Sequence, residues 1–378
     1  MEHLLGEPRR GSVRMTPELY LDANATEKLR PAARAAVLAA LDLVGNPSSV
    51  HAAGRAARRV LEGARETIAA RFGAAPGEVV LTAGGTEANA LAVRGLGRGR
   101  RVLVGATEHP AVLAAAPGPG VLPVRADGTL DLEALETALA GPPALVCLMA
   151  ANNETGVLHP IAEAAALCRA AGAWLHVDAV QAAGRVPVSL AALGVESLAI
   201  SGHKLGGPKG AGALLLRPGL APEAIIAGGG QERGRRGGTE PLPAIAGMAA
   251  AAEAALPEAA ARLAVIRDAI EAGAVAQGAV VAGAGAPRLP NTISLILPGV
   301  PAETQVIALD LAGVRVSAGA ACSSGKVGRS HVLAAMGLGE AAGHAIRVSL
   351  PWDAPEDAAE RFLAAWGAMR ERMERRVG

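Results

Sequence analysis

Only four lysines occur in this chain of 378 residues, and one of them, Lys204, closes the stretch Ser201-Gly202-His203-Lys204. Asp178 ends an apolar run upstream, and Cys322 lies among small residues downstream. A lysine amine that loses its proton can form a Schiff base, and a carboxylate can keep a pyridine nitrogen protonated. With a thiol nearby in sequence, this set indicates pyridoxal phosphate and sulfur chemistry, although each residue alone would more often be a turn or surface residue.

A glycine turn upstream offers a place for a phosphate. The stretch from Thr82 to Asn89 passes from an apolar run through Gly84 and Gly85 into a helix-like segment, with Thr86 at its start. Free N–H groups and the dipole at a helix start favour anions. The turn alone is more often structural, but Ser201 and His203 can add contacts, so the combination favours a phosphate site.

Cys322 is the only cysteine to which we assign chemistry. It lies in Ser317–Gly325, where small side chains leave little to pack, and a mobile exposed thiol is a candidate nucleophile. Cys147 lies in an apolar run and Cys168 in an Ala-rich one, so both are predicted to be buried packing residues. Three widely spaced cysteines support neither a disulfide framework nor a zinc knuckle.

Three other polar residues have both a functional and a structural interpretation. His109 precedes a proline, and it either stacks on a cofactor ring or belongs to a turn. Asn153 and Arg347 either bind a substrate carboxylate or serve the fold. The sequence contains no Gly-x-Ser-x-Gly or His-Glu-x-x-His pattern and no metal-spaced Cys/His cluster, so neither a serine hydrolase nor a metal site is expected.

Composition predicts a globular protein that does not act mainly on nucleic acid. Hydrophobic residues make up 51% of the chain, which suffices for a large core, and 36 basic against 35 acidic residues give a net charge of +1. Residues 1–14 lack the apolar core of a signal peptide, and Gly141-Pro142-Pro143 interrupts the uncharged stretch 137–153. We therefore expect no membrane span and a cytoplasmic location.

Short apolar runs alternate with Ala-rich helical stretches over residues 79–216. The expected strands are Val79–Thr82, Val102–Val104, Leu145–Met149, Trp174–Val177, Leu198–Ile200 and Ala213–Leu216. This order predicts an α/β domain with a mostly parallel sheet, and ligands collect at the carboxyl ends of such strands. The candidates at positions 84–86, 109, 153, 178 and 204 each follow one of these runs.

A smaller α+β domain is expected in the last third of the chain. One or two helices over Ala244–Gln277 lead to a strand at Thr292–Leu297, a helix near Glu303–Leu311, a strand at Val314–Val316 and a terminal helix from Pro355. The predicted division is a large domain over residues 15–250 and a small one over residues 251–378. The small domain is joined by part of the N-terminal segment and carries the Cys322 loop.

The whole set of motifs resembles the cysteine desulfurases, NifS/IscS-like pyridoxal-phosphate enzymes of the class V aminotransferase group. The matching stretches run in family order and are 20–26, 45–51, 84–89, 108–110, 152–156, 178–181, 201–210, 228–239 and 320–325. The resemblance implies a fold-type-I architecture, with a large domain built on a mostly parallel seven-stranded sheet flanked by helices.

The resemblance also implies roles around the cofactor ring. Lys204 would carry the Schiff base and move the Cα proton, Asp178 would hold the pyridine nitrogen, and Gln181 would contact the ring hydroxyl. His109 would stack on the ring face and take part in catalysis. The substrate would be L-cysteine.

Further implied roles concern the cofactor's phosphate and the substrate's carboxylate. The residues implied for the phosphate are Gly85, Thr86, Ser201, His203 and, from a second subunit, Thr239. Asn153 and Arg347 would bind the carboxylate of L-cysteine. Because the site is shared between subunits, the resemblance implies a homodimer.

In the resembled mechanism, the thiolate of Cys322 attacks the substrate sulfur, alanine leaves, and a persulfide passes to an iron–sulfur scaffold or another acceptor protein. Alternatives left open are a selenocysteine lyase, another class V aminotransferase, and a non-catalytic docking protein on the same fold. An aminotransferase would not need Cys322.

Some residues depart from the family pattern. Ala23 stands where a second asparagine is frequent, Arg329 where a proline is common, and Pro351-Trp352-Asp353 replaces a glycine-containing continuation. None of these removes an implied catalytic group, so they bear on partner choice and on the rim of the carboxylate pocket. Residues 1–14 lie outside the resemblance.

Overall fold

The computed structural model describes residues 18–319 and 329–377. Its largest sheet has seven strands in the order β2-β8-β7-β6-β5-β3-β4. These strands are β2 (Val79–Thr82), β3 (Arg101–Gly105), β4 (Gly120–Leu122), β5 (Ala144–Met149), β6 (Trp174–Asp178), β7 (Ser197–Ser201) and β8 (Gly212–Leu216). Only β8 runs antiparallel to its neighbours, which confirms the predicted mostly parallel sheet.

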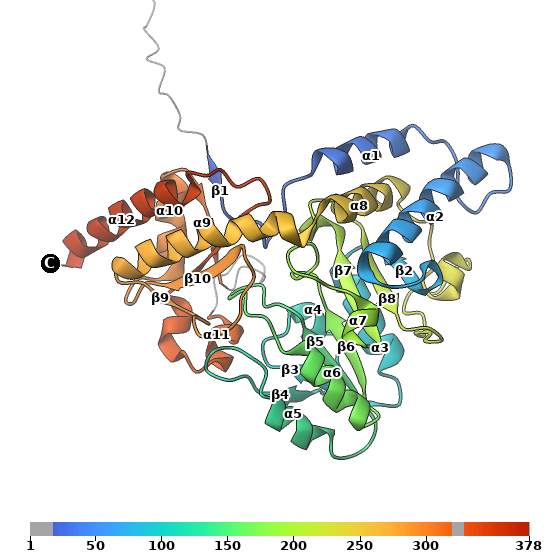
Figure 1. The fold of residues 1–378 in the computed structure, drawn as a ribbon, viewed down its shortest axis with the longest axis horizontal. Helices are drawn as coiled ribbons and strands as arrows, with labels where there is room; N and C mark the ends of the chain where they lie inside the picture. Colours follow the sequence, from blue (N-terminus) through green and yellow to red (C-terminus); the bar gives the residue numbers. More distant parts are fainter. Residues whose placement is uncertain (1–17, 320–328, 378) are drawn as a thin grey trace, which may run out of the picture.

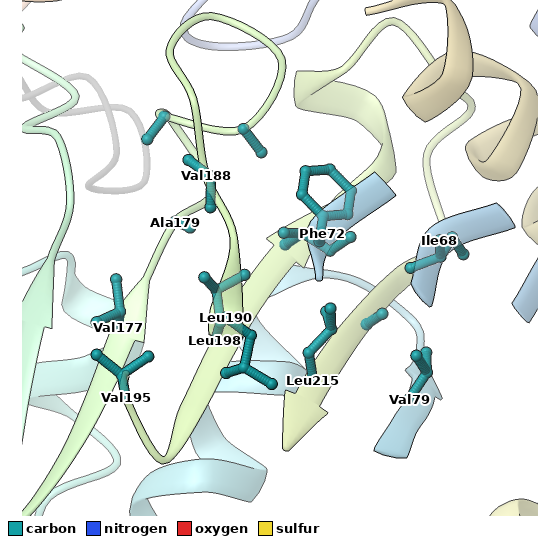
Figure 2. Close-up of a cluster of buried hydrophobic side chains, with 14 of the residues drawn as sticks. Ile68, Phe72, Val79, Val177, Ala179, Val188, Leu190, Val195, Leu198 and Leu215 are labelled. Atoms are coloured by element: carbon teal, nitrogen blue, oxygen red, sulfur yellow. The ribbon is translucent and has the colours of Figure 1, made fainter. Parts of the chain in front are cut away.

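Helices cover both faces of this sheet (Figure 1). The helices of this part are α2 (Ala52–Phe72), α3 (Gly85–Leu96), α4 (Pro110–Leu113), α5 (Leu132–Leu139), α6 (Ile161–Ala170), α7 (Leu190–Leu193) and α8 (Leu242–Ala254), with α1 (Pro31–Leu41) packed on α8. Alternate strand residues face opposite helical layers, so Leu215 packs with the cluster that includes Phe72, whereas Leu214 packs with the cluster that includes Leu91. Figure 2 shows Ile68 and Phe72 of α2 among strand residues Val79, Leu198 and Leu215.

A second, four-stranded antiparallel sheet lies in the last third of the chain, with the order β12-β13-β10-β9. Its strands are β9 (Val280–Val281), β10 (Thr292–Ile296), β12 (Ser317–Ala318) and β13 (Ala345–Ser349). The helices around it are α9 (Pro257–Ala276), α10 (Ala302–Leu311), α11 (His331–Ala335) and α12 (Ala358–Val377). A separate core forms here, in which the rings of Phe362 and Trp366 stack 5.8 Å apart.

The N-terminal segment reaches this second core. Strand β1 (Leu19–Tyr20) pairs in parallel with β11 (Val314–Arg315), and Leu19 and Leu21 are buried in the second core. The predicted Ala-rich stretch forms two helices, α8 and α9. Pro257 is the first residue of α9, a position at which proline is favoured because its missing N–H would have no partner there. Figure 1 shows α9 running from the end of α8 to lie alongside α12.

Within residues 18–319 and 329–377, no helix combines the length and apolar character that crossing a bilayer requires.

Candidate functional site

A cavity of about 210 Å³ lies at the carboxyl ends of five strands of the large sheet. β2, β3, β5, β6 and β7 each lead into residues of its wall, as expected for open parallel sheets, whose ligands bind outside the carboxyl ends of the strands. Its lining includes most of the residues singled out from the sequence: Gly85, Thr86, His109, Asn153, Asp178, Gln181, Ser201, His203 and Lys204. Residues spread over 120 positions of the sequence, from Gly85 to Lys204, therefore line one cavity.

One end of the cavity has the features of an anion site. Gly85 and Thr86 begin α3, a helix of 12 residues whose first N–H groups lack intrahelical partners. A Cβ on Gly85 would lie 2.7 Å from Cγ2 of Val180 and 3.3 Å from Cβ of Ser201. The glycine is thus required for the close approach of α3 to these two residues, which leaves the hydroxyls of Thr86 and Ser201 at the same wall.

His203 completes this end from the short helix after β7. Its Nδ1 lies 3.2 Å from Oγ1 of Thr26, and burial lowers the pKa of His203 to about 4, with help from the neighbouring charge of Lys204. The ring is therefore neutral near pH 7 and offers an N–H group without a full charge.

The opposite side of the cavity is built on Asp178. Its Oδ2 accepts a 2.7 Å hydrogen bond from Nδ2 of Asn89, and its Oδ1 accepts one of 2.9 Å from the backbone N–H of Val180. Burial raises the pKa of Asp178, whereas these donors and the nearby His109 and Lys204 lower it. Carboxylate hydrogen bonds of this kind favour the charged form, which is the form that can hold a protonated ring nitrogen.

Asn89 is itself oriented by a buried histidine. Nε2 of His176 lies 2.9 Å from Oδ1 of Asn89, and Nδ1 of His176 lies 2.9 Å from Oγ of Ser197. Burial lowers the pKa of His176 to about 3, so the ring is neutral. Because Oδ1 of Asn89 only accepts, the proton is on Nε2 of His176, and the Ser197 hydroxyl donates to Nδ1.

His109 projects into the cavity from the start of α4. Its Nδ1 accepts a 3.1 Å hydrogen bond from the backbone N–H of Ala111, which assigns the ring proton to Nε2. Burial lowers the pKa of His109, and Asp178 opposes that shift. The hydrogen bond to Ala111 fixes the neutral ring at the N-cap of α4, where its flat face can contact a ligand.

Lys204 follows β7 and the short helix Gly202–Lys204. Its Nζ donates a 2.9 Å hydrogen bond to the backbone carbonyl of Ala25 and a further one to that of Asn24. Nε2 of Gln181 also donates to the carbonyl of Asn24, at 3.1 Å. The amine thus lies where the N-terminal segment passes the cavity.

Arg347 lies behind the wall and does not line it. Its side chain is 2% exposed, and it donates to Oδ1 of Asp22 at 2.7 Å and to the carbonyl of Asn153 at 3.1 Å. The structure therefore brings Asn153 to the cavity and couples Arg347 to it through the backbone, with Asp22 as the present partner of the guanidinium.

Thr239 is a further expected site residue that does not line this cavity. Thr239 is exposed on the segment between β8 and α8. Cys322 lies outside the described residues. Cys147 and Cys168 are buried, as predicted.

Sequence reasoning assigned no role to three residues that shape the cavity. Asn89 ends a quoted motif and His176 lies in an expected strand, and the contact between them emerges only when α3 packs beside β6. Glu108 precedes His109; burial, and then Asp178, raise its pKa well above the usual range, and its Oε1 accepts a 2.7 Å hydrogen bond from the N–H of Met149. Both effects favour the neutral form of Glu108, beside the carboxylate of Asp178.

Comparison with known proteins identifies relatives over nearly the whole chain. The family model described as aminotransferase class-V matches residues 19–362. A cysteine desulfurase of Cereibacter sphaeroides is 45% identical over 349 residues, which cover 88% of this chain and 90% of that protein.

Solved structures of related proteins have the same fold as this chain. The NifS-like protein from Rickettsia africae superposes with a TM-score of 0.85 at 33% identity, covering 94% of this chain and 99% of that chain. A structure described as SspA in complex with cysteine has a TM-score of 0.78 at 29% identity, covering 88% of this chain and 99% of that chain. The fold-type-I architecture expected from the motifs is thereby confirmed.

Proposed function

Because the chain belongs to the aminotransferase class-V family and is an enzyme of the cysteine desulfurase type, we propose that its cavity binds pyridoxal phosphate and L-cysteine. The observation that carries this proposal is the cavity itself, where Lys204, Asp178 and His109 meet beside the start of α3. An amine, a carboxylate, a flat neutral ring and an anion site form the donor set that a phosphorylated pyridine aldehyde requires.

The residues fit this cofactor at each end. Gly85, Thr86, Ser201 and His203 would hold the phosphate, and Asp178, Gln181 and His109 would hold the ring by its nitrogen, hydroxyl and face. When bound, pyridoxal phosphate supplies an electron sink that makes the Cα proton of an amino acid removable. Lys204 would bond the cofactor and, once L-cysteine has displaced it, carry that proton.

The substrate carboxylate would be held by Asn153 and Arg347. Arg347 would exchange its bond to Asp22 for a bidentate bond to the substrate, which is the geometry a guanidinium prefers.

Sulfur transfer requires a nucleophile, and we assign that role to Cys322. Its thiolate forms a bond to the substrate sulfur while the Cβ–S bond breaks, and the electron pair remains with the substrate carbon. That carbon is protonated, alanine leaves, and Cys322 retains a persulfide. An iron–sulfur scaffold or another sulfur acceptor would then take the terminal sulfur.

A homodimer would complete the site by supplying Thr239 from the second subunit. Support comes from the exposure of Thr239 and from a set of exposed large apolar side chains around α1 and before the Thr239 segment. These are Leu38, Leu41, Val44, Val50, Ile225 and Ile226. Exposed large apolar side chains that gather in one patch mark association surfaces. We also keep residues 15–250 and 251–378 as the proposed large and small domains.

Borohydride trapping tests the assignment of Lys204. We expect reduction of the protein with bound pyridoxal phosphate to fix the cofactor on Lys204, as read by peptide mass spectrometry. Lys204→Ala should release no alanine from L-cysteine, whereas Lys209→Ala, a change at an exposed lysine five positions away, should retain the wild-type rate. Trapping on another lysine, or an active Lys204→Ala enzyme, contradicts the proposal.

A further inference from the structure

The segment that carries Thr239 is held in an unusual backbone conformation. Between β8 and α8 lies the loop Gly228–Thr239, which we call the exchange loop. Glu232 and Arg233 have φ of 50° and 59°, and they are the only non-glycine residues with positive φ in the part of the chain that is described. Residues other than glycine rarely adopt positive φ, so surrounding contacts must hold the backbone in this conformation.

Glu232 supplies the strongest of these contacts. Its carboxylate accepts hydrogen bonds from both terminal nitrogens of Arg65, at 2.7 and 2.8 Å, and one of 2.8 Å from the backbone N–H of Leu81 in β2. The Glu232 side chain is fully buried and that of Arg65 is 6% exposed. This charge-assisted fork fastens the middle of the exchange loop to α2 and β2.

Two further arginines in the exchange loop, both before Thr239, bind it to the large domain. Arg235 donates to the carbonyls of Gly77 and Val79, at 3.0 and 3.2 Å. Arg236 donates to Glu87 at 2.8 Å, and Glu87 lies in the first turn of α3, next to Thr86. The loop is therefore anchored to the strand and helix that form the anion end of the cavity.

All these anchors act within one subunit, and Thr239 takes part in none of the contacts just described. Gly238 precedes it with φ of 105°, a conformation that glycine alone adopts without strain, and Thr239 is exposed. A rigid stem with an exposed tip is the arrangement expected of a segment that acts on another molecule, because pre-organisation reduces the entropy lost on contact.

We propose that Glu232 and Arg65 are positioning residues that hold the exchange loop preformed, so that Thr239 reaches the cofactor phosphate of a second copy of this chain. The proposal rests on the proposed function and specifies that the pair acts on the partner's site and not on its own. Neither residue touches the cavity of its own subunit.

The first test measures cofactor retention. Glu232→Gln keeps the size of the side chain and removes the charge, and we expect the dissociation constant of pyridoxal phosphate to rise at least about tenfold. Glu271→Gln is the matched control. Glu271 lies on α9 and forms an ion pair with Arg288 at 2.7 Å, and neither residue belongs to the exchange loop or lines the cavity. Should Glu232→Gln fold poorly, Arg65→Lys retains the charge and loses the fork.

The second test uses mixed dimers and distinguishes positioning from a general structural role. In one dimer, one subunit carries Glu232→Gln and the other Lys204→Ala, so the only intact Lys204 receives an intact exchange loop. In the other, one subunit is wild type and the other carries both changes, so the only intact Lys204 receives the altered loop. Borohydride-fixed cofactor on Lys204 at limiting pyridoxal phosphate measures affinity in both.

We expect wild-type affinity in the first mixed dimer and the full tenfold loss in the second. The reverse pattern, or equal loss in both, overturns the positioning role and leaves the proposed function intact. A wild-type protein that is monomeric or takes up no cofactor overturns the proposed function as well.

Discussion

At the scale of single residues, the site depends on keeping one carboxylate charged in a buried cavity. Asp178 is opposed by burial and supported by the Asn89 side chain and the Val180 N–H. Asn89 can donate to Asp178 only while its oxygen is turned to His176, which is neutral because it is buried. The neutral histidine thus determines the orientation of the amide that stabilises the charge.

This reasoning predicts that Asn89→Ala shifts the pH dependence of the enzyme. Loss of the donor raises the pKa of Asp178, and activity that needs the carboxylate is present above this pKa and is lost as pH falls through it. One charge-assisted hydrogen bond is worth about 1.5–3 kcal/mol. We therefore expect the acid limb of kcat/KM to move up by about one to two pH units, with the loss of activity largest on the acid side of the shifted limb.

The control for this variant is a buried amide far from the cavity. Gln305 donates to the carbonyls of Val300 and His344 in the second core, so Gln305→Ala should lower stability and leave the acid limb in place. If the acid limb of Asn89→Ala coincides with that of the wild type, Asn89 does not support the Asp178 charge.

At the scale of elements, the sequence was most informative where apolar runs are bounded by turns. Six strands of the large sheet were predicted to within one or two residues, since their side chains are buried on both faces and form continuous apolar runs. β4 was missed because Gly120–Leu122 is a short edge strand with two exposed residues, so it has no such pattern.

Specific side-chain contacts between elements far apart in the sequence could not be predicted. The position of Lys204, Asp178 and Thr86 after successive strands predicted a shared wall, which the cavity confirms. The link between Arg347 and Asp22 depends on how the N-terminal segment crosses the second sheet. No local pattern encodes that crossing.

The exchange loop permits a prediction about backbone strain. Arg233 is exposed, has φ of 59° and donates one hydrogen bond, to the carbonyl of Gly77, so Arg233→Gly should relieve strain at the loss of that bond and raise the free energy of unfolding by up to about 1 kcal/mol. Arg235 has φ of −85° and donates three hydrogen bonds, so Arg235→Gly should lower it by about 1–2 kcal/mol. Urea midpoints with unchanged slopes measure both. Destabilisation of equal size by both changes would contradict the strain argument.

At the scale of the whole molecule, the N-terminal segment joins the two cores at the cavity. β1 pairs with β11 beside the second core, and four residues later the side chain of Asn24 donates to Thr292 of β10 at 2.9 Å. The carbonyl of Asn24 then accepts hydrogen bonds from Gln181 and Lys204. Displacement of the second core would therefore shift the carbonyl to which the amine of Lys204 donates.

Association is the second property at this scale. Leu41 ends α1 and is 61% exposed, and we predict that Leu41→Glu shifts the proposed dimer toward monomer and weakens cofactor binding at least about tenfold, because a charge would then enter the proposed apolar interface. Leu311 is 82% exposed on α10, and Leu311→Glu should leave the dimer intact. Sedimentation at several concentrations measures both variants; a Leu41→Glu dimer of wild-type stability would place the interface elsewhere.

The most direct test of the account is the mass of Cys322 after exposure of the enzyme with bound pyridoxal phosphate to L-cysteine. We predict a gain of one sulfur atom on Cys322 for each alanine formed in the first turnover, with Cys147 and Cys168 unchanged because both are buried. Cys322→Ala should keep the bound cofactor and form no protein persulfide. Alanine released with Cys322 unmodified, or sulfide production undiminished in Cys322→Ala, would contradict the proposed sulfur transfer.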